Sequence, residues 1–186
     1  KVIAAYTVAT RIDSLALLPA MNIGQALATF VGQNIGAQKT ERVKSGLKAT
    51  FVISSTISLF VTGMIIIFGD VLMRLFTDDA NVIEIGQDYL VIVSSFYLLF
   101  SAMFTVNGVL RGAGDTLIPM FITLFSLWLI RIPVAYFLSG KIGETGIWCA
   151  VLIALFSGTV VSYFYYLSGN WKTKVVVKQK KSIKME

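Results

Sequence analysis

The chain has 186 residues, of which 56% are hydrophobic and 14% are charged, and its mean hydropathy is +0.77. Soluble domains carry about 25% charged residues, so this composition excludes an ordinary soluble domain and indicates a membrane protein. The chain has no histidine and a single cysteine, Cys149. These counts exclude a histidine-based hydrolytic triad, an internal disulfide and a cysteine-rich metal site, and we expect no enzyme activity, metal or cofactor.

Five long apolar segments predict an all-α bundle with about five membrane-spanning helices. A helix needs about 20 mostly apolar residues to span a bilayer. The segments cover residues 12–35, 49–69, 89–110, 116–140 and 145–168. We therefore expect a transmembrane unit over residues 1–168, followed by a basic tail over 169–186.

The first segment is the most polar of the five, and it supplies three candidate residues for contact with a transported ion or molecule. Asp13 lies near its outer start, either at the membrane interface or facing an internal cavity. Asn22 and Gln25 are three residues apart, so they share one helix face. They either hydrogen-bond to neighbouring helices or contact a ligand.

The connections between segments differ in charge, which predicts the topology. Residues 36–48, 110–116 and the tail hold most of the lysines and arginines, whereas 68–88 and 140–144 hold only two, beside several acids. Cytoplasmic loops carry the excess of Lys and Arg, so the first set and the C-terminus are predicted to be cytoplasmic. This topology explains the net charge of +6, and we expect no nucleic-acid partner.

Two glycine-containing junctions, GAQKT at 36–40 and GAGDT at 112–116, each close one predicted helix and open the next. Neither is a phosphate loop, because no lysine directly follows the second glycine and the third glycine of the dinucleotide fingerprint is absent. Their shared pattern predicts equivalent turns, with Gly36 as the glycine of the first.

The second junction predicts a hinge made by Arg111, Gly112, Gly114 and Asp115. The two glycines allow a positive φ in a tight reversal. Arg111 suits the C-terminus of one helix, and Asp115 suits the N-terminus of the next, as an anion or as a cap. Whether this hinge also gates the inner face is a hypothesis.

Two further candidates lie in the later spans. Arg131 is about 22 Å beyond the start of its helix at 1.5 Å per residue. An ionisable residue inside a membrane marks a functional site by default, but this one could instead snorkel to the outer interface. Pro133 is expected to open the backbone ladder beside it. Asn107 either bridges helices or contacts a ligand.

The tail over 169–186 is basic and amphipathic. Trp171 is expected to be an interfacial anchor. The tail lysines would meet anionic lipid at about 1 kcal/mol each.

Three motifs, FVGQNIGAQKTERVK, GVLRGAGDTLIPM and LWLIRIPVAYFL, occur in this order along the chain. With them the chain resembles the multidrug and toxic compound extrusion (MATE) family, and within it the bacterial DinF- or MepA-like efflux proteins. That family has twelve helices in two six-helix lobes. The resemblance implies that this chain corresponds to helices eight to twelve, so we expect a fragment whose partner is an absent N-terminal lobe.

The resemblance also implies an antiporter of the bacterial plasma membrane. Such a protein exchanges Na⁺ or H⁺ for a cationic amphipathic drug by alternating access. Many members carry an acid within the helix that matches 89–110, and this sequence has none there, so Asp13 or an acid in the absent lobe would bind the coupling ion. Two alternatives stay open: a flippase for a lipid-linked precursor, and a non-transporting membrane scaffold that docks partners through residues 171–186.

Overall fold

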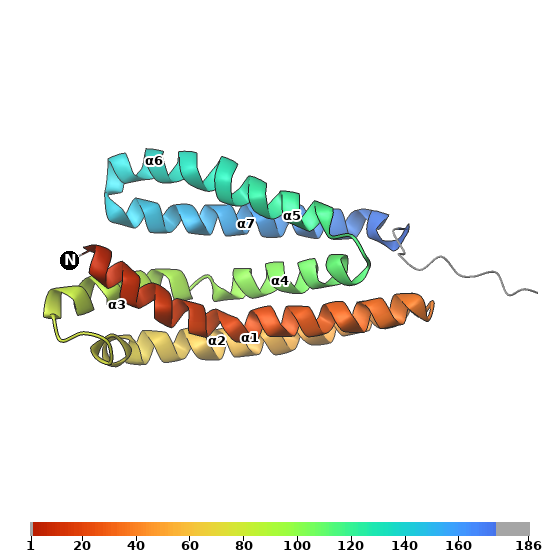
Figure 1. The fold of residues 1–186 in the computed structure, drawn as a ribbon, viewed down its shortest axis with the longest axis horizontal. Coiled ribbons are helices and arrows are strands. Elements are labelled where there is room, and N and C mark those ends of the chain that lie inside the picture. Colours follow the sequence, from red (N-terminus) through yellow and green to blue (C-terminus); the bar gives the residue numbers. More distant parts are fainter. Residues whose placement is uncertain (1, 174–186) are drawn as a thin grey trace, which may run out of the picture.

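The computed structural model describes residues 2–173, apart from the side chains of Glu144 and Thr173, and all regular structure in this range is helical (Figure 1). The first four helices are α1 (Val2–Gly36), α2 (Thr40–Arg74), α3 (Ala80–Ser94) and α4 (Tyr97–Gly112). The remaining elements are α5 (Leu117–Leu124), the π-helical turn η1 (Phe125–Ile130), α6 (Arg131–Ile142), α7 (Glu144–Ser168) and the 3₁₀ turn η2 (Asn170–Thr173).

Four helical stretches of the described chain are long and apolar enough to cross a membrane: Val2–Gly36, Thr40–Arg74, Leu117–Ile142 and Thr145–Ser168. The pair α3 and α4 adds a fifth if it is counted as one span with a bend of 46°. The prediction of an all-α membrane bundle with about five spans is confirmed.

The helices extend well beyond the predicted spans. α1 starts at Val2, α2 takes up most of the connection predicted at 36–48, and α2 and α3 together take up most of that predicted at 68–88, which leaves only 37–39 and 75–79 as turns. Hydropathy marks where a chain leaves the hydrocarbon region, whereas a helix ends only where its backbone hydrogen bonds do. Charged residues at the ends of α2 are therefore helical.

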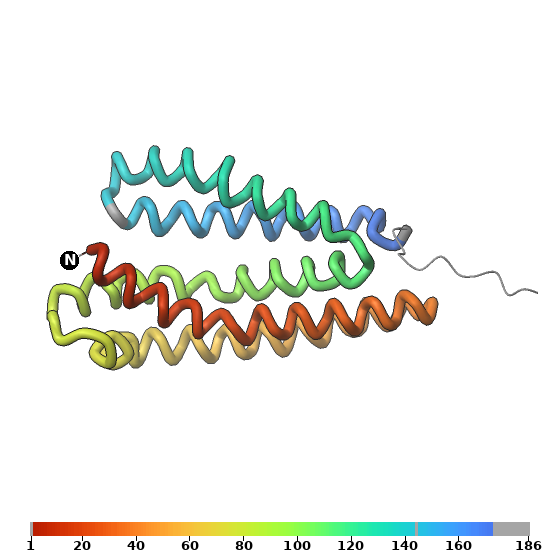
Figure 2. Tube along the Cα trace, in the orientation of Figure 1, coloured from red at the N-terminus to blue at the C-terminus, as the bar shows by residue number. Residues whose placement is uncertain are grey.

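The predicted third span is not one continuous helix, because it breaks at Ser95 and Phe96 (Figure 2). The hydroxyls of Ser94 and Ser95 both donate to the carbonyl of Val91, at 3.3 and 2.9 Å. Such bonds compete with the helix ladder. The carbonyl of Ser94, which the break releases, accepts the hydroxyl of Thr62 from α2 at 2.7 Å.

The turns gather at the two ends of the bundle as the charge pattern predicts. The α1–α2 turn, the α4–α5 turn and η2 lie at one end in Figure 1, and the N-terminus, the α2–α3 loop and the α6–α7 turn lie at the other. The connections rich in Lys and Arg therefore share one end of the molecule.

α1 and α4 cross with their backbones in close contact. α1 contributes Gly24, Ala28 and Gly32, and α4 contributes Gly108 and Gly112, each set spaced by four residues. A Cβ atom added to Gly108 would lie 2.5 Å from the Gly24 carbonyl oxygen, and one added to Gly112 would lie 2.3 Å from that of Ala28. Small residues at this spacing let membrane helices approach closely. Gly112, predicted as a hinge residue, instead packs within this crossing.

The two glycine-containing junctions form the same turn. In each, the residue in the left-handed region donates its N–H to the carbonyl three residues back, and the next residue donates to the carbonyl five residues back, as in a Schellman motif. The positive φ falls on Gly114 (88°), as expected, and on Gln38 (60°) rather than on Gly36. Gly36 is exposed, and a Cβ atom added to it would contact nothing.

Asp115 lies directly before Thr116, the N-cap of α5, so it is an anion at this helix N-terminus, one of its two predicted roles, and not the cap. Its buried carboxylate accepts the hydroxyl of Tyr165 from α7. The prediction for Trp171 is wrong. Trp171 is only 1% exposed, and its indole N–H donates to the Tyr166 carbonyl at 2.9 Å. The indole is buried against α1, α2 and α4, so it is no interfacial anchor. The tail lysines beyond 173 lie outside the described residues.

Candidate functional site

Asp13 lies within α1, roughly 16 Å from the first residue of the helix at 1.5 Å per residue, because α1 begins before the predicted segment. Each oxygen of its carboxylate accepts a tyrosine hydroxyl. Tyr97 donates to Oδ1 at 2.5 Å, and Tyr89 donates to Oδ2 at 3.4 Å. The two tyrosines flank the break between α3 and α4, so this break aims both hydroxyls at one carboxylate.

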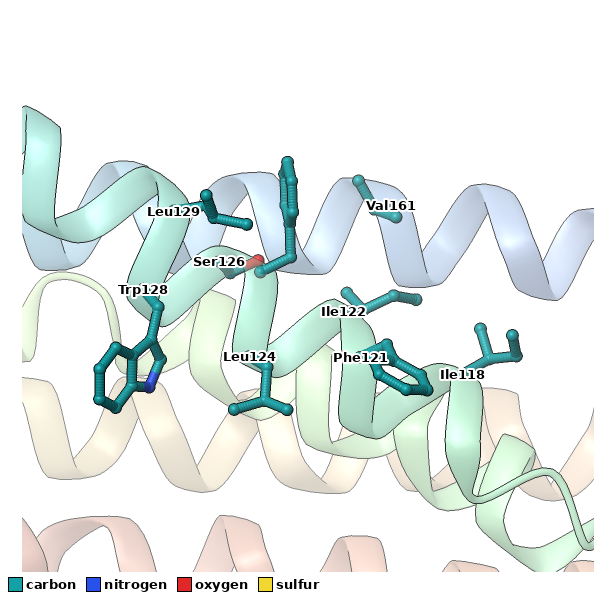
Figure 3. A pocket seen from close by; sticks show the side chains of 9 residues that line it. Ile118, Phe121, Ile122, Leu124, Ser126, Trp128, Leu129 and Val161 are labelled. Carbon is teal, nitrogen blue, oxygen red and sulfur yellow. The ribbon is translucent and has the colours of Figure 1, made fainter.

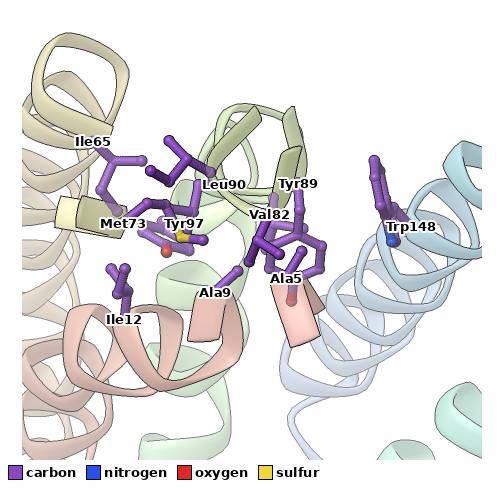
Figure 4. Packing of buried hydrophobic residues seen from close by; sticks show 12 residues of the cluster. Ala5, Ala9, Ile12, Ile65, Met73, Val82, Tyr89, Leu90, Tyr97 and Trp148 are labelled. Atoms are coloured by element: carbon purple, nitrogen blue, oxygen red, sulfur yellow. The ribbon is translucent and has the colours of Figure 1, made fainter. Parts of the chain in front are cut away.

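A buried aromatic cluster fixes these tyrosines. Tyr89 and Tyr97 are 6% and 3% exposed. The ring of Tyr89 meets Tyr6 and Trp148 edge to face, with centroids 5.4 and 5.6 Å apart. Figure 4 shows how Tyr89, Tyr97 and Trp148 pack with aliphatic residues from α1, α2 and α3. Since packing sets the ring positions, the hydroxyls are preorganised toward Asp13.

Asp13 and Arg131 face the same cavity, which has a volume of about 240 Å³. Its other polar lining residues are Tyr6, Thr10, Ser14 and Tyr89. Within the described chain, the salt bridges closer than 4.0 Å are Lys44–Glu41 and Arg74–Asp70. The opposite charges of Asp13 and Arg131 thus share a cavity without direct contact.

The π-helical turn η1 ends immediately before Arg131 and sets its position. The backbone N–H of Arg131 donates to the Ser126 carbonyl, five residues back. Pro133 has no N–H to donate and its ring crowds the preceding turn, so the widened helix is its physical consequence. The expected opening of the ladder beside Pro133 is confirmed, and Arg131 lines the internal cavity.

Asn107 lies elsewhere, in α4, and is 2% exposed. Its Oδ1 accepts the Ser162 hydroxyl from α7 at 3.0 Å. It therefore bridges two helices, which was one of its two predicted roles. Asn22 and Gln25 do share one face of α1, but both are exposed and bridge no helices within the described chain.

Asn22 and Gln25 belong to a longer polar stripe on α1, which sequence reasoning missed and which the exposed Leu15 and Leu18 interrupt. At 100° per residue its members lie within about 100° of one another, and all are exposed: Thr7, Arg11, Ser14, Asn22, Gln25, Thr29 and Gln33. The exposed face of α2 is apolar by contrast, with Phe51, Leu59, Phe60, Ile66 and Ile67. The helical spacing of these polar residues is the signal that could have revealed the stripe.

The groove between α5, η1 and α7 has different chemistry. Its volume is about 620 Å³, and Figure 3 shows that its labelled lining is apolar except for Ser126. Carbon-lined surfaces of this kind suit lipid tails.

In residues 2–173, no group of three or more His, Cys, Asp or Glu side chains could hold a metal ion. The Asp13 cavity is therefore the strongest candidate for ion chemistry.

Ionisable side chains that face a cavity in a helical membrane bundle are typical of membrane transport proteins. The chain belongs to the MatE family, whose model matches residues 1–137. This confirms the resemblance found in the three motifs, and the family is one of transporters.

Two curated relatives are similar over nearly the whole chain. The probable multidrug resistance protein NorM of Thermotoga maritima is 31% identical over 176 residues, which are 94% of this chain and 38% of that protein. The probable multidrug resistance protein YpnP of Bacillus subtilis is 30% identical over 179 residues, 96% of this chain and 40% of that protein. The chain thus spans about two fifths of the length of these relatives.

Solved MATE structures share the fold. An outward-facing MATE family transporter matches with a TM-score of 0.83 at 20% identity, over 90% of this chain and 38% of that one. An inward-facing one matches with a TM-score of 0.81 at 18% identity, over 93% and 41%. The fold of this region is therefore similar to chains captured in both conformations.

Proposed function

We propose that this chain is part of a multidrug efflux antiporter of a bacterial plasma membrane, with its C-terminus in the cytoplasm. The transporter exports cationic amphipathic drugs in exchange for H⁺ or Na⁺ by alternating access. Its family and the names of its relatives support the export of drugs. Its partners are membrane lipid, the drugs and the further helices of a second lobe.

The observation that carries the proposal is the cavity shared by Asp13 and Arg131. A charged residue inside a membrane is costly and is retained where it moves an ion or binds a substrate. Asp13 is the coupling carboxylate in this proposal. Arg131 repels a second positive charge, and both carboxylate oxygens already accept hydroxyls. Both features stabilise the carboxylate and oppose H⁺ and Na⁺ alike, so the coupling ion of this proposal is either of the two.

The polar stripe on α1 supplies the drug pathway in this proposal. Polar side chains on a spanning helix face protein or water rather than lipid. The stripe is exposed in this chain, so it lies along a passage shared with other helices of the transporter. Asn22 and Gln25 are its central side chains.

The test is drug export by the complete protein in proteoliposomes, driven by an imposed gradient of either H⁺ or Na⁺. We expect Asp13→Asn to lower gradient-driven dye export at least tenfold, because the amide can carry neither a proton nor a negative charge. Asp78→Asn is the matched control, since Asp78 is exposed in the α2–α3 loop. Unchanged gradient-driven export by Asp13→Asn would contradict the proposed role of the site.

A further inference from the structure

A second cavity, which the proposed coupling site does not use, lies between α4, α5–η1 and α7. Its volume is about 170 Å³. Most of its wall is apolar and includes Phe100, Met103, Phe104 and Leu127. Its polar lining residues are Asn107, Arg111, Thr123 and Ser126.

Two buried hydrogen-bond donors face this cavity. Asn107 uses its Oδ1 to accept the Ser162 hydroxyl, which leaves its amide N–H groups for the cavity. Ser126 is 4% exposed, and among the described residues its hydroxyl has no protein partner. Thr123 by contrast donates to the Pro119 carbonyl at 2.8 Å. Neither group is among the described polar atoms that are buried without a partner, which are the hydroxyls of Ser55 and Ser101, so both reach the open space of the cavity and can donate to an occupant.

The charge of the cavity is positive. Arg111 lines it at the last turn of α4, and in the described part of the chain no carboxylate lies within 4.0 Å of the guanidinium. The described lining residues include no acid. The nearby Asp115 is turned toward Tyr165. The occupant should therefore carry an anionic group at the Arg111 end.

The size and length of the cavity limit what enters it. Drug-sized pockets have volumes of about 300–1,000 Å³, so 170 Å³ admits a slender chain and not a whole drug. Phe100 and Arg111 are eleven residues apart, or about 16 Å along the helix. This is the shape of an amphiphile that lies along the membrane normal, with its head at the end of the molecule rich in Lys and Arg.

We propose that this cavity binds the phosphate end and part of one acyl chain of an anionic phospholipid. The phosphate lies at Arg111, and an acyl chain lies beside the stacked rings of Phe100 and Phe104, whose centroids are 4.4 Å apart. Asn107 is one helical turn, about 6 Å, deeper than Arg111. Asn107 therefore meets the ester oxygens, which follow the phosphate in such a lipid. Ser126 lies deeper, beside Met103 and Gly158, at the level of the acyl chain.

The test is lipid binding to the complete purified protein in detergent, measured by native mass spectrometry and by the unfolding temperature. The probes are phosphatidylglycerol, phosphatidylcholine with the same acyl chains, and water-soluble glycerol 3-phosphate. We expect phosphatidylglycerol to bind at least fivefold more tightly than phosphatidylcholine, and glycerol 3-phosphate to bind weakly. Equal binding of the two lipids would overturn the proposal, and glycerol 3-phosphate binding as tightly as phosphatidylglycerol would assign the cavity to free phosphate esters.

Three variants locate the site. Arg111→Gln should reduce the preference for phosphatidylglycerol about fivefold, the effect of one basic charge near an anionic lipid. Arg111→Lys should retain most of it, which separates loss of charge from misfolding. Lys48→Gln is the matched control, because it removes an exposed charge from α2 near the same end. A preference that persists in Arg111→Gln would contradict the site, and none of these measurements depends on transport.

Discussion

Tyr97 and Tyr89 contribute unequally to the site, because their hydrogen bonds to Asp13 differ in length. The bond from Tyr97 measures 2.5 Å and that from Tyr89 measures 3.4 Å. Hydrogen bonds to charged groups contribute about 1.5–3 kcal/mol when they are short and well aligned. Tyr97 should therefore hold the carboxylate in place, and Tyr89 should act more through the packing of its ring.

Tyr97→Phe should lower the free energy of unfolding by about 1.5–3 kcal/mol, because it removes a donor to a half-buried carboxylate. Tyr89→Phe keeps the ring contacts and loses only the longer bond, so its effect should be smaller. Thermal unfolding of both variants in the same detergent measures the difference. A larger loss for Tyr89→Phe would show that the two bonds have the opposite ranking.

The chemistry of the site could be predicted only in part from single residues. Asp13 and Arg131 stand out in the sequence because charges inside spans are rare. Asp13 and Arg131 line one cavity only because helices α1 and α6 are packed in the same bundle, and no local sequence pattern predicts that arrangement. Tyr89 and Tyr97 were missed because, within a membrane span, aromatic residues were counted as apolar. A buried tyrosine hydroxyl nevertheless usually has a hydrogen-bond partner.

The close crossing of helices α1 and α4 depends on glycine residues. Gly108 and Gly112 of α4 approach the carbonyl oxygens of Gly24 and Ala28 so closely that a methyl group has no room. The spacing G-x-x-x-G in α4 is visible in the sequence, where the junction pattern drew attention to Gly112 as a hinge instead. Spans were predictable from hydropathy, but their ends and the α3–α4 break were not, because they depend on hydrogen bonds of the backbone and of side chains such as Ser94 and Ser95, which hydropathy does not report.

Gly112→Ala should destabilise the protein by about 1–3 kcal/mol, the usual cost of overpacking, because the new methyl would meet the Ala28 carbonyl. Gly63→Ala is the matched control. Gly63 lies within α2, and a Cβ atom there contacts nothing within 4 Å, so the change should be neutral or stabilising by up to about 1 kcal/mol. Equal unfolding temperatures for the two variants would argue against a tight α1–α4 crossing.

The whole molecule consists of two groups of helices, α1–α4 and α5–α7, that meet along a seam (Figure 1). Backbone contacts tie each group internally, at the α1–α4 crossing and between Gly146 and Leu138. Side-chain hydrogen bonds such as Ser162 to Asn107 tie the seam. The Asp13 cavity and the second cavity, which Arg111 and Asn107 line, both lie along this seam, since each is lined by residues from both groups. The polar stripe of α1 faces away from the rest of the described bundle.

Replacing the centre of the stripe, Asn22→Leu with Gln25→Leu, should lower drug export by the complete protein several-fold without lowering its unfolding temperature. Both side chains are exposed, so the described packing does not need them. The control is Ile66→Ala with Ile67→Ala on the apolar face of α2, which should leave export unchanged. The measurement is dye export by the two double variants in proteoliposomes. Equal export by the Asn22/Gln25 and Ile66/Ile67 variants would place the drug pathway elsewhere.

The burial of Trp171 sets a practical limit on how the C-terminus can be altered. Its indole closes the cluster formed by α1, α2 and α4 at the end of the bundle, where it stacks on Tyr166. An affinity tag or fluorescent reporter joined beyond Thr173 would leave this contact in place. A truncation before Asn170 would instead expose the ends of three helices, so topology reporters fused there would report on a damaged protein.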